Sequence, residues 1–324
     1  MQAVVETNAG EQRAGNQHRY AIPALAGLLL LALLALLAVC GWALQQHDQK
    51  RLRVISLPAY PLALHDDNAS LARGRYLYDT RGCAGCHGQQ GEGRLFIDDP
   101  LTGQRAAGPN ISPGPGNVIA GYKPADWERV LRHGVKPNGQ PVLLMPSDDY
   151  NRLSDDDVAS LVQYLMQLPP VPGRAAVLEL PTSLRLRHGL GQWQDAAEKI
   201  DHARPPEPAE PEALSVAYGR YVAQACTRCH GAQLTGGRDD ASQPWAPSLA
   251  PDLPTASGSG NHSGMAAYAD PALFRRLMRT GTRPDHSAVS RSMPFESLSQ
   301  MSDLELDALQ LYLRSLPPSP AAQP

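Results

Sequence analysis

Cys83-Ala84-Gly85-Cys86-His87 is a pentapeptide whose pattern returns once, as Cys226-Thr227-Arg228-Cys229-His230. Each copy has two cysteines separated by two residues, with a histidine directly after the second cysteine. Thiols in this pattern bond covalently to the vinyl groups of haem, and the imidazole ligates the iron. The sequence therefore predicts two covalently bound haem c groups, attached through the four thiols of Cys83, Cys86, Cys226 and Cys229.

Zinc sites and disulfide bonds are the alternative uses of such cysteines. A structural zinc site needs a partnering pair of ligands for each Cys pair. The sequence has no Cys or His pair at zinc-finger spacing between or after the motifs. The motifs leave only Cys40 of the five cysteines, which excludes a disulfide framework. Haem is therefore the predicted cofactor.

The composition fits domains built around a large prosthetic group. The length of 324 residues indicates about two domains, and the formal net charge of -3 gives no reason to expect nucleic acid as a partner. Aromatic residues make up 6% of the chain, whereas there are 30 prolines and 28 glycines. This balance favours a mainly α fold of short helices and long loops, in which a haem supplies core volume.

An apolar stretch at residues 21–44 predicts a transmembrane anchor, because its length at helical rise is enough to cross a bilayer. It separates a polar N-terminal tail (1–20) from a juxtamembrane linker (45–69). The alternative is a signal peptide, but the stretch is longer than a usual h-region and no clear cleavage site follows it. Cys40 is either a small apolar residue of this helix or a poorly matching lipoprotein site, since Val39 precedes it.

Basic residues give no clear orientation for this anchor. Arg13 and Arg19 precede it, and Lys50, Arg51 and Arg53 follow it. Covalent haem attachment in bacteria takes place on the far side of the cytoplasmic membrane. We therefore expect a single-pass protein of the bacterial inner membrane whose haem domains lie in the periplasm.

The soluble body is an internal repeat. Its units are expected at residues 70–170 and 214–318, joined by a Pro-rich connector (171–213) and followed by a C-terminal tail (319–324). Each unit closes with a helix that begins at a Ser cap and stops at a proline. The aligned segments are Gly74-Arg75-Tyr76 with Gly219-Arg220-Tyr221, Gly108-Pro109-Asn110 with Ala246-Pro247-Ser248, Met145-Pro146 with Met293-Pro294, Ser154 with Ser302, and Tyr164-Leu165 with Tyr312-Leu313.

The order of these features resembles the class I cytochrome c domain in both units. The resemblance implies two tandem domains of this class, in which His87 and His230 ligate the haem iron on one side and Met145 and Met293 on the other. Such a His/Met pair fills both axial positions, and the soft thioether favours Fe(II). A haem of this kind transfers electrons and does little else.

The resemblance also implies roles for two prolines. The carbonyl oxygens of Pro109 and Pro247 are expected to accept the Nδ1 hydrogen of the two iron-ligating histidines and so to fix their tautomer. Met265 is the one competitor for Met293, because it also lies in a loop. The helical methionines are expected in the core, and the histidines outside the motifs at the surface; these residues are Met166, Met278, Met301, His47, His133, His188, His202, His262 and His286.

A narrower resemblance is to the membrane-bound cytochrome c subunits of periplasmic alcohol, aldehyde and gluconate dehydrogenases, which usually carry three haem domains. It rests on Asn110-Ile111-Ser112-Pro113, on Asn138-Gly139 before Met145-Pro146, and on the connector from Leu184-Arg185 to Trp193. It implies an electron carrier that is not itself an enzyme. The carrier would relay single electrons from a periplasmic donor, such as a dehydrogenase, toward a terminal oxidase or a quinone-linked complex of the respiratory chain.

Two other functions stay open at this point. A di-haem cytochrome c peroxidase is the alternative of similar length, but it needs one haem with a displaceable distal ligand and a nearby acid or base. The two matching Met-Pro loops argue against it. A haem-based sensor or an oxidase assembly subunit is the third possibility, and the lack of an attached signalling domain argues against a sensor.

Charge differs between the two units beside their Met-Pro loops. The simple interpretation is two solvated faces, and the sharper hypothesis is that the two haems dock different redox partners. The first unit is acidic there and the second is basic; the residues are Asp148, Asp149, Asp155, Asp156 and Asp157, against Arg275, Arg276, Arg279, Arg283 and Arg291.

Overall fold

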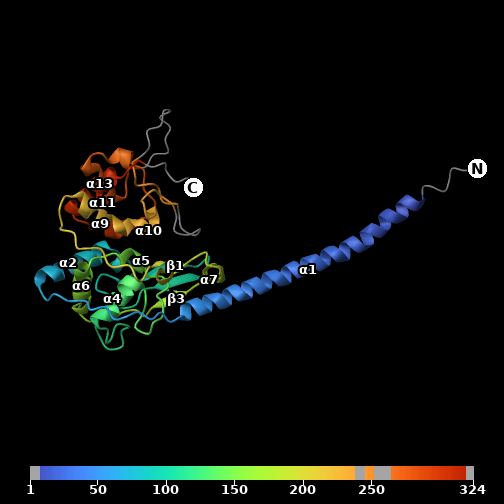
Figure 1. Cartoon of the computed structure of the whole chain (residues 1–324), viewed down its shortest axis with the longest axis horizontal. Helices are drawn as coiled ribbons and strands as arrows, with labels where there is room; N and C mark the ends of the chain where they lie inside the picture. The colour runs from blue at the N-terminus through green and yellow to red at the C-terminus, as the bar shows by residue number, and fades with distance from the viewer. Residues whose placement is uncertain (1–7, 238–244, 252–263, 319–324) are drawn as a thin grey trace, which may run out of the picture.

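One long helix projects from a body made of two helical units (Figure 1). The computed structural model describes residues 8–237, 245–251 and 264–318. The prediction of a mainly α fold is confirmed. The long helix, α1 (Asn8–Leu52), extends past both ends of the expected apolar anchor. The first seven residues of the expected N-terminal tail and the whole expected tail at 319–324 lie outside the described residues.

The first unit and the connector hold the following elements, in chain order: α2 (Asn68–Thr80), α3 (Cys83–His87), β1 (Leu95–Asp99), β2 (Gln104–Ala107), α4 (Pro124–His133), α5 (Ser147–Tyr150), α6 (Asp155–Met166), β3 (Val177–Glu179), α7 (Thr182–Gly189) and α8 (Ala196–Lys199).

The second unit repeats the helical part of this order with α9 (Val216–Val222), the 3₁₀ turn η1 (Ala223–Cys226), α10 (Thr227–His230), the 3₁₀ turn η2 (Gly264–Tyr268), α11 (Pro271–Thr280), α12 (Phe295–Leu298) and α13 (Asp303–Ser315).

A close helix crossing organises each unit. α2 packs on α6 in the first unit and α9 packs on α13 in the second. The crossings are close because a glycine stands at each: a Cβ at Gly74 would lie 2.0 Å from the Ser160 carbonyl oxygen, and one at Gly219 would lie 1.9 Å from the Ala308 carbonyl oxygen. The Gly-Arg-Tyr segment shared by the repeats therefore supplies the glycine that each crossing requires.

The helix ends follow the signals in the sequence. Ser154 and Ser302 cap α6 and α13, and each hydroxyl accepts a hydrogen bond from the backbone N–H three residues on. Gly134 and Gly281 end α4 and α11 in the left-handed conformation, with φ of 64° and 65°.

A small sheet is the one element type that the sequence analysis did not predict. β1, β2 and β3 form a three-stranded antiparallel sheet in which the central strand, β2, pairs with both others. β3 belongs to the connector, so this part of the connector packs back on the first unit through backbone pairing.

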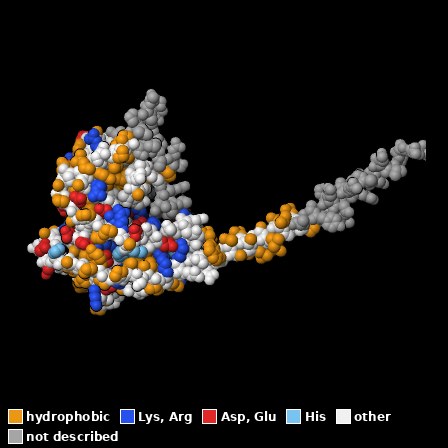
Figure 2. Space-filling model, viewed as in Figure 1, with side chains coloured by type: hydrophobic (Ala, Val, Ile, Leu, Met, Phe, Trp, Pro, Cys, Tyr) orange, Lys and Arg blue, Asp and Glu red, His pale blue; other side chains and the backbone are white. Residues whose placement is uncertain are grey.

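The apolar part of α1 is exposed over residues 25–39, whereas Ala43, nearer its C-terminal end, is buried. In the described part of the chain it is the one helix long and apolar enough to cross a membrane by length and composition, over Leu25–Leu52. Hydrophobic side chains cover its described surface, whereas the body shows mixed charge (Figure 2). Its C-terminal end contacts α7, where a Cβ at Gly189 would lie 1.8 Å from the Ala43 carbonyl oxygen.

Candidate functional site

The two Cys-x-x-Cys-His motifs occupy equivalent positions in the two units. Each follows the first helix of its unit: the first motif forms α3, and the second spans the end of η1 and α10. None of the four motif cysteines forms a disulfide, so all of them are available for thioether bonds to haem. Burial raises the pKa of Cys83 and Cys226 to about 12, with nearby charges adding smaller effects.

The motif histidines make the same hydrogen bond in both units. Nδ1 of His87 lies 2.9 Å from the carbonyl oxygen of Pro109, and Nδ1 of His230 lies 2.8 Å from that of Pro247. A carbonyl oxygen can only accept, so each Nδ1 carries the hydrogen and Nε2 keeps its lone pair. Burial lowers the pKa of both imidazoles, although the carbonyl opposes this shift. Each histidine is thus held neutral in the tautomer that can ligate iron through Nε2.

The two Met-Pro loops also adopt one geometry. Pro146 has φ -81° and ψ 63°, and Pro294 has φ -80° and ψ 64°. In each loop the carbonyl oxygen of the methionine accepts a hydrogen bond of 2.9 Å from the residue after the proline. Met145 and Met293 are partly buried against the apolar core. With two thiols, one Nε2 and one thioether, each unit has the donor set that a covalently bound, six-coordinate haem requires.

A core position is expected for the three helical methionines, and two of them have it. Met278 and Met301 are buried, with exposed fractions of 2% and 3%. The prediction of a core position is wrong for Met166, which is 39% exposed at the end of α6. Met265, the competitor for Met293, is buried in η2.

Both units match cytochrome families. Residues 69–165 match the family described as "Cytochrome C oxidase, cbb3-type, subunit III", and residues 216–317 match "Cytochrome c". Together the matches cover most of the body. The chain therefore belongs to the cytochromes c and consists of two tandem cytochrome c domains preceded by a long apolar helix.

Its relatives narrow this class. The fructose dehydrogenase cytochrome subunit of Gluconobacter japonicus is 29% identical over 80% of this chain and 55% of the relative. The gluconate 2-dehydrogenase cytochrome c subunit of Pantoea cypripedii is 31% identical over 81% of this chain and 63% of the relative. A diheme cytochrome c-type protein of Cereibacter sphaeroides is 27% identical over 76% of this chain and 86% of the relative. The chain thus spans less than two thirds of the length of the first two.

These relationships confirm several predictions. The protein is a di-haem cytochrome c with two covalently bound haem c groups, similar to the cytochrome c subunits of sugar-acid, sugar and alcohol dehydrogenases. The relatives are named as cytochrome subunits of dehydrogenases, and these names agree with the electron-transfer role that the two domains predict.

The two domains meet through their equivalent tyrosines. The Tyr76 hydroxyl accepts a hydrogen bond of 2.9 Å from the backbone N–H of Ser302 and donates one of 2.5 Å to Glu305. The Tyr221 hydroxyl accepts one of 3.0 Å from the backbone N–H of Ser154 and donates one of 2.7 Å to Asp157. Each domain therefore completes the N-terminal cap of the other domain's last helix.

The attachment motifs face this same contact. α3 of the first domain touches α12, the helix after Met293-Pro294, and η1 and α10 of the second domain touch α5, the helix after Met145-Pro146. The arrangement is reciprocal, because each motif contacts the helix that follows the other domain's Met-Pro loop. Sequence analysis did not find this interface, although the repeated Gly-Arg-Tyr segment was its one visible signal.

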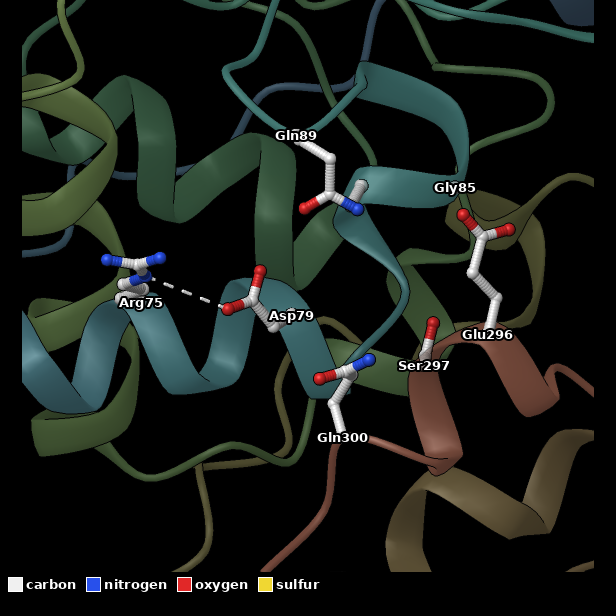
Figure 3. Close-up of a pocket in the computed structure, with 8 residues that line it drawn as sticks. Arg75, Asp79, Gly85, Gln89, Glu296, Ser297 and Gln300 are labelled. Carbon is white, nitrogen blue, oxygen red and sulfur yellow. Dashed lines mark ion pairs between the residues drawn. The ribbon is translucent and has the colours of Figure 1, made fainter. Parts of the chain in front are cut away.

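A pocket lies on one side of the interface, between α3 and α12 (Figure 3). Its lining is polar and comes from both domains. Gly85 of the first motif and Ser297 of α12 lie across it from one another, and the rest of the lining is formed by Arg75, Asp79, Ala84, Gln89, Glu296 and Gln300.

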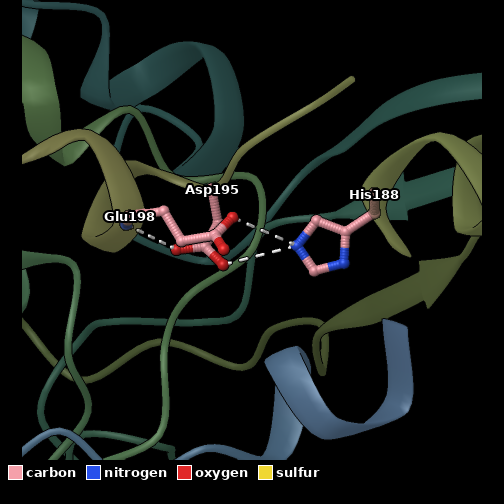
Figure 4. Close-up of side chains that lie close together, drawn as sticks. All are labelled: His188, Asp195 and Glu198. Carbon is pink, nitrogen blue, oxygen red and sulfur yellow. Dashed lines mark hydrogen bonds and ion pairs between the residues drawn. The ribbon is translucent and has the colours of Figure 1, made fainter. Parts of the chain in front are cut away.

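The prediction of a surface position is wrong for His188 and His47. His188 is fully buried, its Nδ1 lies 2.9 Å from Nδ1 of His47, and its Nε2 lies 3.5 Å from Asp195 and 3.9 Å from Glu198 (Figure 4). The side chains of His188, Asp195 and Glu198 lie close enough together to resemble a set of metal ligands. Each carboxylate already has a cationic partner, however: Arg53 donates two hydrogen bonds of 2.7 Å to Asp195.

The second cation of this cluster is Lys50, whose Nζ lies 2.9 Å from Glu198. Burial acts to raise the pKa of Asp195, but the hydrogen bonds from Arg53 hold it at about 2. His47, Lys50 and Arg53 all belong to the C-terminal end of α1 or directly follow it. We therefore attribute the cluster to the attachment of α1 to the body.

Many of the charges beside the Met-Pro loops are paired within the protein. Arg275 forms an ion pair of 2.7 Å with Asp307, and Arg279 one of 2.9 Å with Asp303. On the acidic side, Asp148 lies 3.2 Å from Lys199. The free charge on both faces is smaller than the sequence indicates, and the existence of two docking faces stays a prediction.

Proposed function

We propose that this chain is a membrane-anchored, periplasmic di-haem cytochrome c that relays single electrons from a periplasmic dehydrogenase toward the respiratory chain or a terminal oxidase. The observation that carries the proposal is the matched pair of His-Pro hydrogen bonds, each in a domain with a Met-Pro loop of identical backbone geometry. Two haems with both axial positions filled suit electron transfer and not peroxide chemistry.

Residues 70–170 and 214–318 are the two haem-binding domains of this proposal. Cys83 and Cys86 hold one haem and Cys226 and Cys229 the other, through thioether bonds. His87 and Met145 are the axial ligands of the first iron, and His230 and Met293 those of the second. The haem supplies the one-electron redox chemistry. The prolines at 109 and 247 hold each histidine in the required orientation through their carbonyl oxygens.

The exposed apolar surface of α1 supports its assignment as the anchor, with residues 21–44 in the bilayer. The basic residues after the span have a structural explanation. Lys50 and Arg53 pair with acidic residues of the body, so they need not act as cytoplasmic retention signals. These basic residues are therefore compatible with a body on the periplasmic side.

The relatives support a dehydrogenase as electron donor. Their names describe cytochrome subunits of fructose, gluconate and alcohol dehydrogenases. For this chain we infer a donor of the same kind, an enzyme that oxidises a sugar, a sugar acid or an alcohol, and a quinone-linked complex or an oxidase as acceptor.

The test is a reduction assay on the full chain in detergent, with haem installed by the covalent maturation system. Catalytic subunits of the three dehydrogenase types and their substrates are added in turn, and haem absorbance is followed. We expect at least one type to reduce both haems, a quinone analogue or oxidase-containing membranes to reoxidise them, and added peroxide to be left intact.

Met145→Leu and Met293→Leu are the matched variants, since each removes one thioether at nearly constant volume. Each should open one haem to external ligands and leave the other unchanged. Steady peroxide consumption by the wild-type chain, or a Met variant that alters neither haem, would contradict the proposal.

A further inference from the structure

The interface between the two domains contains one buried ion pair that joins them. Arg81 lies just after α2, two residues before Cys83, and its side chain is 5% exposed. Its Nη2 lies 2.6 Å from Oε1 of Glu305 and its Nη1 lies 3.3 Å from Oε2. The Glu305 side chain, in the first turn of α13, has no exposed surface.

Further contacts hold this pair in place from both domains. Tyr76 donates a hydrogen bond to Glu305, and the Tyr150 hydroxyl donates one of 2.9 Å to the backbone carbonyl of Arg81. Tyr218 adds a longer contact of 3.4 Å to Glu305. The Arg81 guanidinium therefore has little freedom to leave this position.

The Arg81 cation lies within electrostatic reach of both attachment motifs. It opposes the upward shift that burial gives to the thiol pKa of Cys83, and it acts in the same sense on Cys226 across the interface. These are the first cysteines of the two motifs. The contacts agree with this, since Tyr150, which is bonded to Arg81, belongs to α5, and α5 touches η1, which ends at Cys226. The ion pair of Arg81 and Glu305 therefore lies near the first cysteine of both motifs, and Glu305 opposes Arg81 at Cys226.

The second domain has no ion pair equivalent to Arg81–Glu305 among the described residues. The residue equivalent to Arg81 is Gln224, also two residues before its motif, and the residue equivalent to Glu305 is Asp157. Asp157 pairs with Arg73 of its own domain at 2.7 Å. Among the described residues this buried bridging cation comes from the first domain alone. Arg94 of the first domain also reaches Glu296 across the interface at 2.7 Å, but both of these side chains are about half exposed.

We propose that Arg81, fixed by Glu305, is a positioning residue for electron exchange between the two haems, which sets the facing of their attachment edges and raises both reduction potentials together. This inference rests on the proposed function, because it takes both motifs to carry electron-transfer haems. In the exchange one electron leaves a ferrous iron and reduces the ferric iron of the other domain, with no bond made or broken. The Arg81 cation stabilises the reduced state of each haem, since reduction removes one positive charge, and the Glu305 carboxylate offsets this effect.

The test compares Arg81→Gln with Glu305→Gln in redox titrations of the full chain, followed by haem absorbance. Arg81→Gln copies the residue of the other repeat and should lower both potentials. One charge at about 10 Å and an effective dielectric constant of about 20 changes each reduction equilibrium by roughly tenfold, or about 59 mV. Glu305→Gln leaves the cation, removes the anion and should raise both potentials.

Both single variants break the same ion pair, so a purely structural role would change the reduction potentials in the same direction. Shifts in opposite directions indicate that the two charges act on the potentials directly. Arg51→Gln is the control, because it breaks an exposed ion pair with Asp48 at the C-terminal end of α1, and it should shift neither potential. The double variant Arg81→Gln/Glu305→Gln removes both charges, and it should return both potentials toward the wild type once the single variants have shifted them in opposite directions.

Same-direction shifts in the two single variants, a shift of one haem only, or no shift would overturn the proposal. Flash-induced electron exchange between the haems should also be slower in Arg81→Gln, and an unchanged rate would count against a positioning role. Failure of the proposed function looks different, since the wild-type chain itself would then show a high-spin haem and consume peroxide.

Discussion

The two sides of the domain interface share their tyrosine contacts but differ in their ion pairs. Tyr76 and Tyr221 complete the helix caps of α13 and α6 in the same way. The first domain then sends Arg81 to a fully buried Glu305, whereas the second sends Arg228, from within its motif, to Asp149. The Arg228–Asp149 side chains are 31% and 14% exposed, so this second pair lies closer to solvent.

The pocket at the interface lies at the position that is equivalent, in the repeat, to the Arg228–Asp149 ion pair. Gly85 stands where the second motif has Arg228, and Ser297 stands where α5 has Asp149. Small residues thus leave a pocket at one site, and an ion pair occupies its equivalent. The symmetric contacts thus hold the two domains together, while the asymmetric charges give the two haem sites different surroundings.

The largest expected effect is a difference in unfolding free energy between variants of the two ion pairs. Glu305→Ala leaves the Arg81 cation buried without a partner, which should cost about 3–5 kcal/mol of unfolding free energy. Asp149→Ala frees a partly exposed Arg228 that can reach water, so about 1 kcal/mol or less is expected. Denaturant unfolding of the full chain in detergent measures both, and equal losses would contradict the difference in burial.

The close helix crossings should respond equally in the two domains. Gly74→Ala and Gly219→Ala each force a Cβ onto a backbone carbonyl, which should cost about 3 kcal/mol. Gly41→Ala in α1 is the control, because its added Cβ would meet no atom within 4 Å and its backbone is helical. A large difference between the two crossing variants in unfolding would break the equivalence of the domains.

The reciprocal tyrosines should give smaller, matched losses. Tyr76→Phe leaves the Ser302 N–H without its acceptor, and Tyr221→Phe does the same to Ser154, so each should cost about 1–2 kcal/mol. Hydrogen exchange at those two amides measures the effect locally. Protection that survives in either variant would show that the cross-domain cap is not formed there.

The smallest expected effect is a pH dependence of the stability that comes from Asp149, on the side of the interface with the Arg228–Asp149 pair. Burial raises the pKa of Asp149 from its ordinary 3.8 to about 6, although Arg228 opposes the shift. The folded state therefore binds this proton more tightly than the unfolded state, and stability relative to Asp149→Asn should increase as pH falls from 7 to 5.

Glu305 should show the opposite behaviour. Burial acts to raise its pKa, but Arg81 holds it below the ordinary value of 4.5. Its contribution to stability is therefore present above that value and lost only as pH falls below it. Unfolding midpoints of wild type, Asp149→Asn and Glu305→Gln between pH 7 and 5 compare the two sides, and a change in the Glu305 contribution over that range would contradict the assignment.

Local features of the fold could be predicted because local chemistry determines them. The motifs, the Ser caps of α6 and α13, and the glycine ends of α4 and α11 all follow from residues within a few positions of one another. The hydrogen bonds of the motif histidines to Pro109 and Pro247 were expected from the resemblance to class I cytochromes c, and the structure has both.

The missed features are contacts between distant parts of the chain. Tyr76 and Glu305 are 229 positions apart, and His47 and His188 are 141 apart. No periodicity marks such pairs, and a histidine in a polar stretch gives no sign that α1 will cover it. The strand β3 was missed for the same reason, since a three-residue segment becomes a strand only when β2 lies beside it.

Both repeats are expected to carry a low-spin haem with one His and one Met ligand. The most direct measurement is electron paramagnetic resonance with near-infrared absorption on the fully oxidised full chain, repeated on Met145→Leu and Met293→Leu. We predict two Met-ligated low-spin ferric haems, of which each variant loses one. A high-spin haem in the wild type, or a variant that leaves both signals intact, would contradict the account.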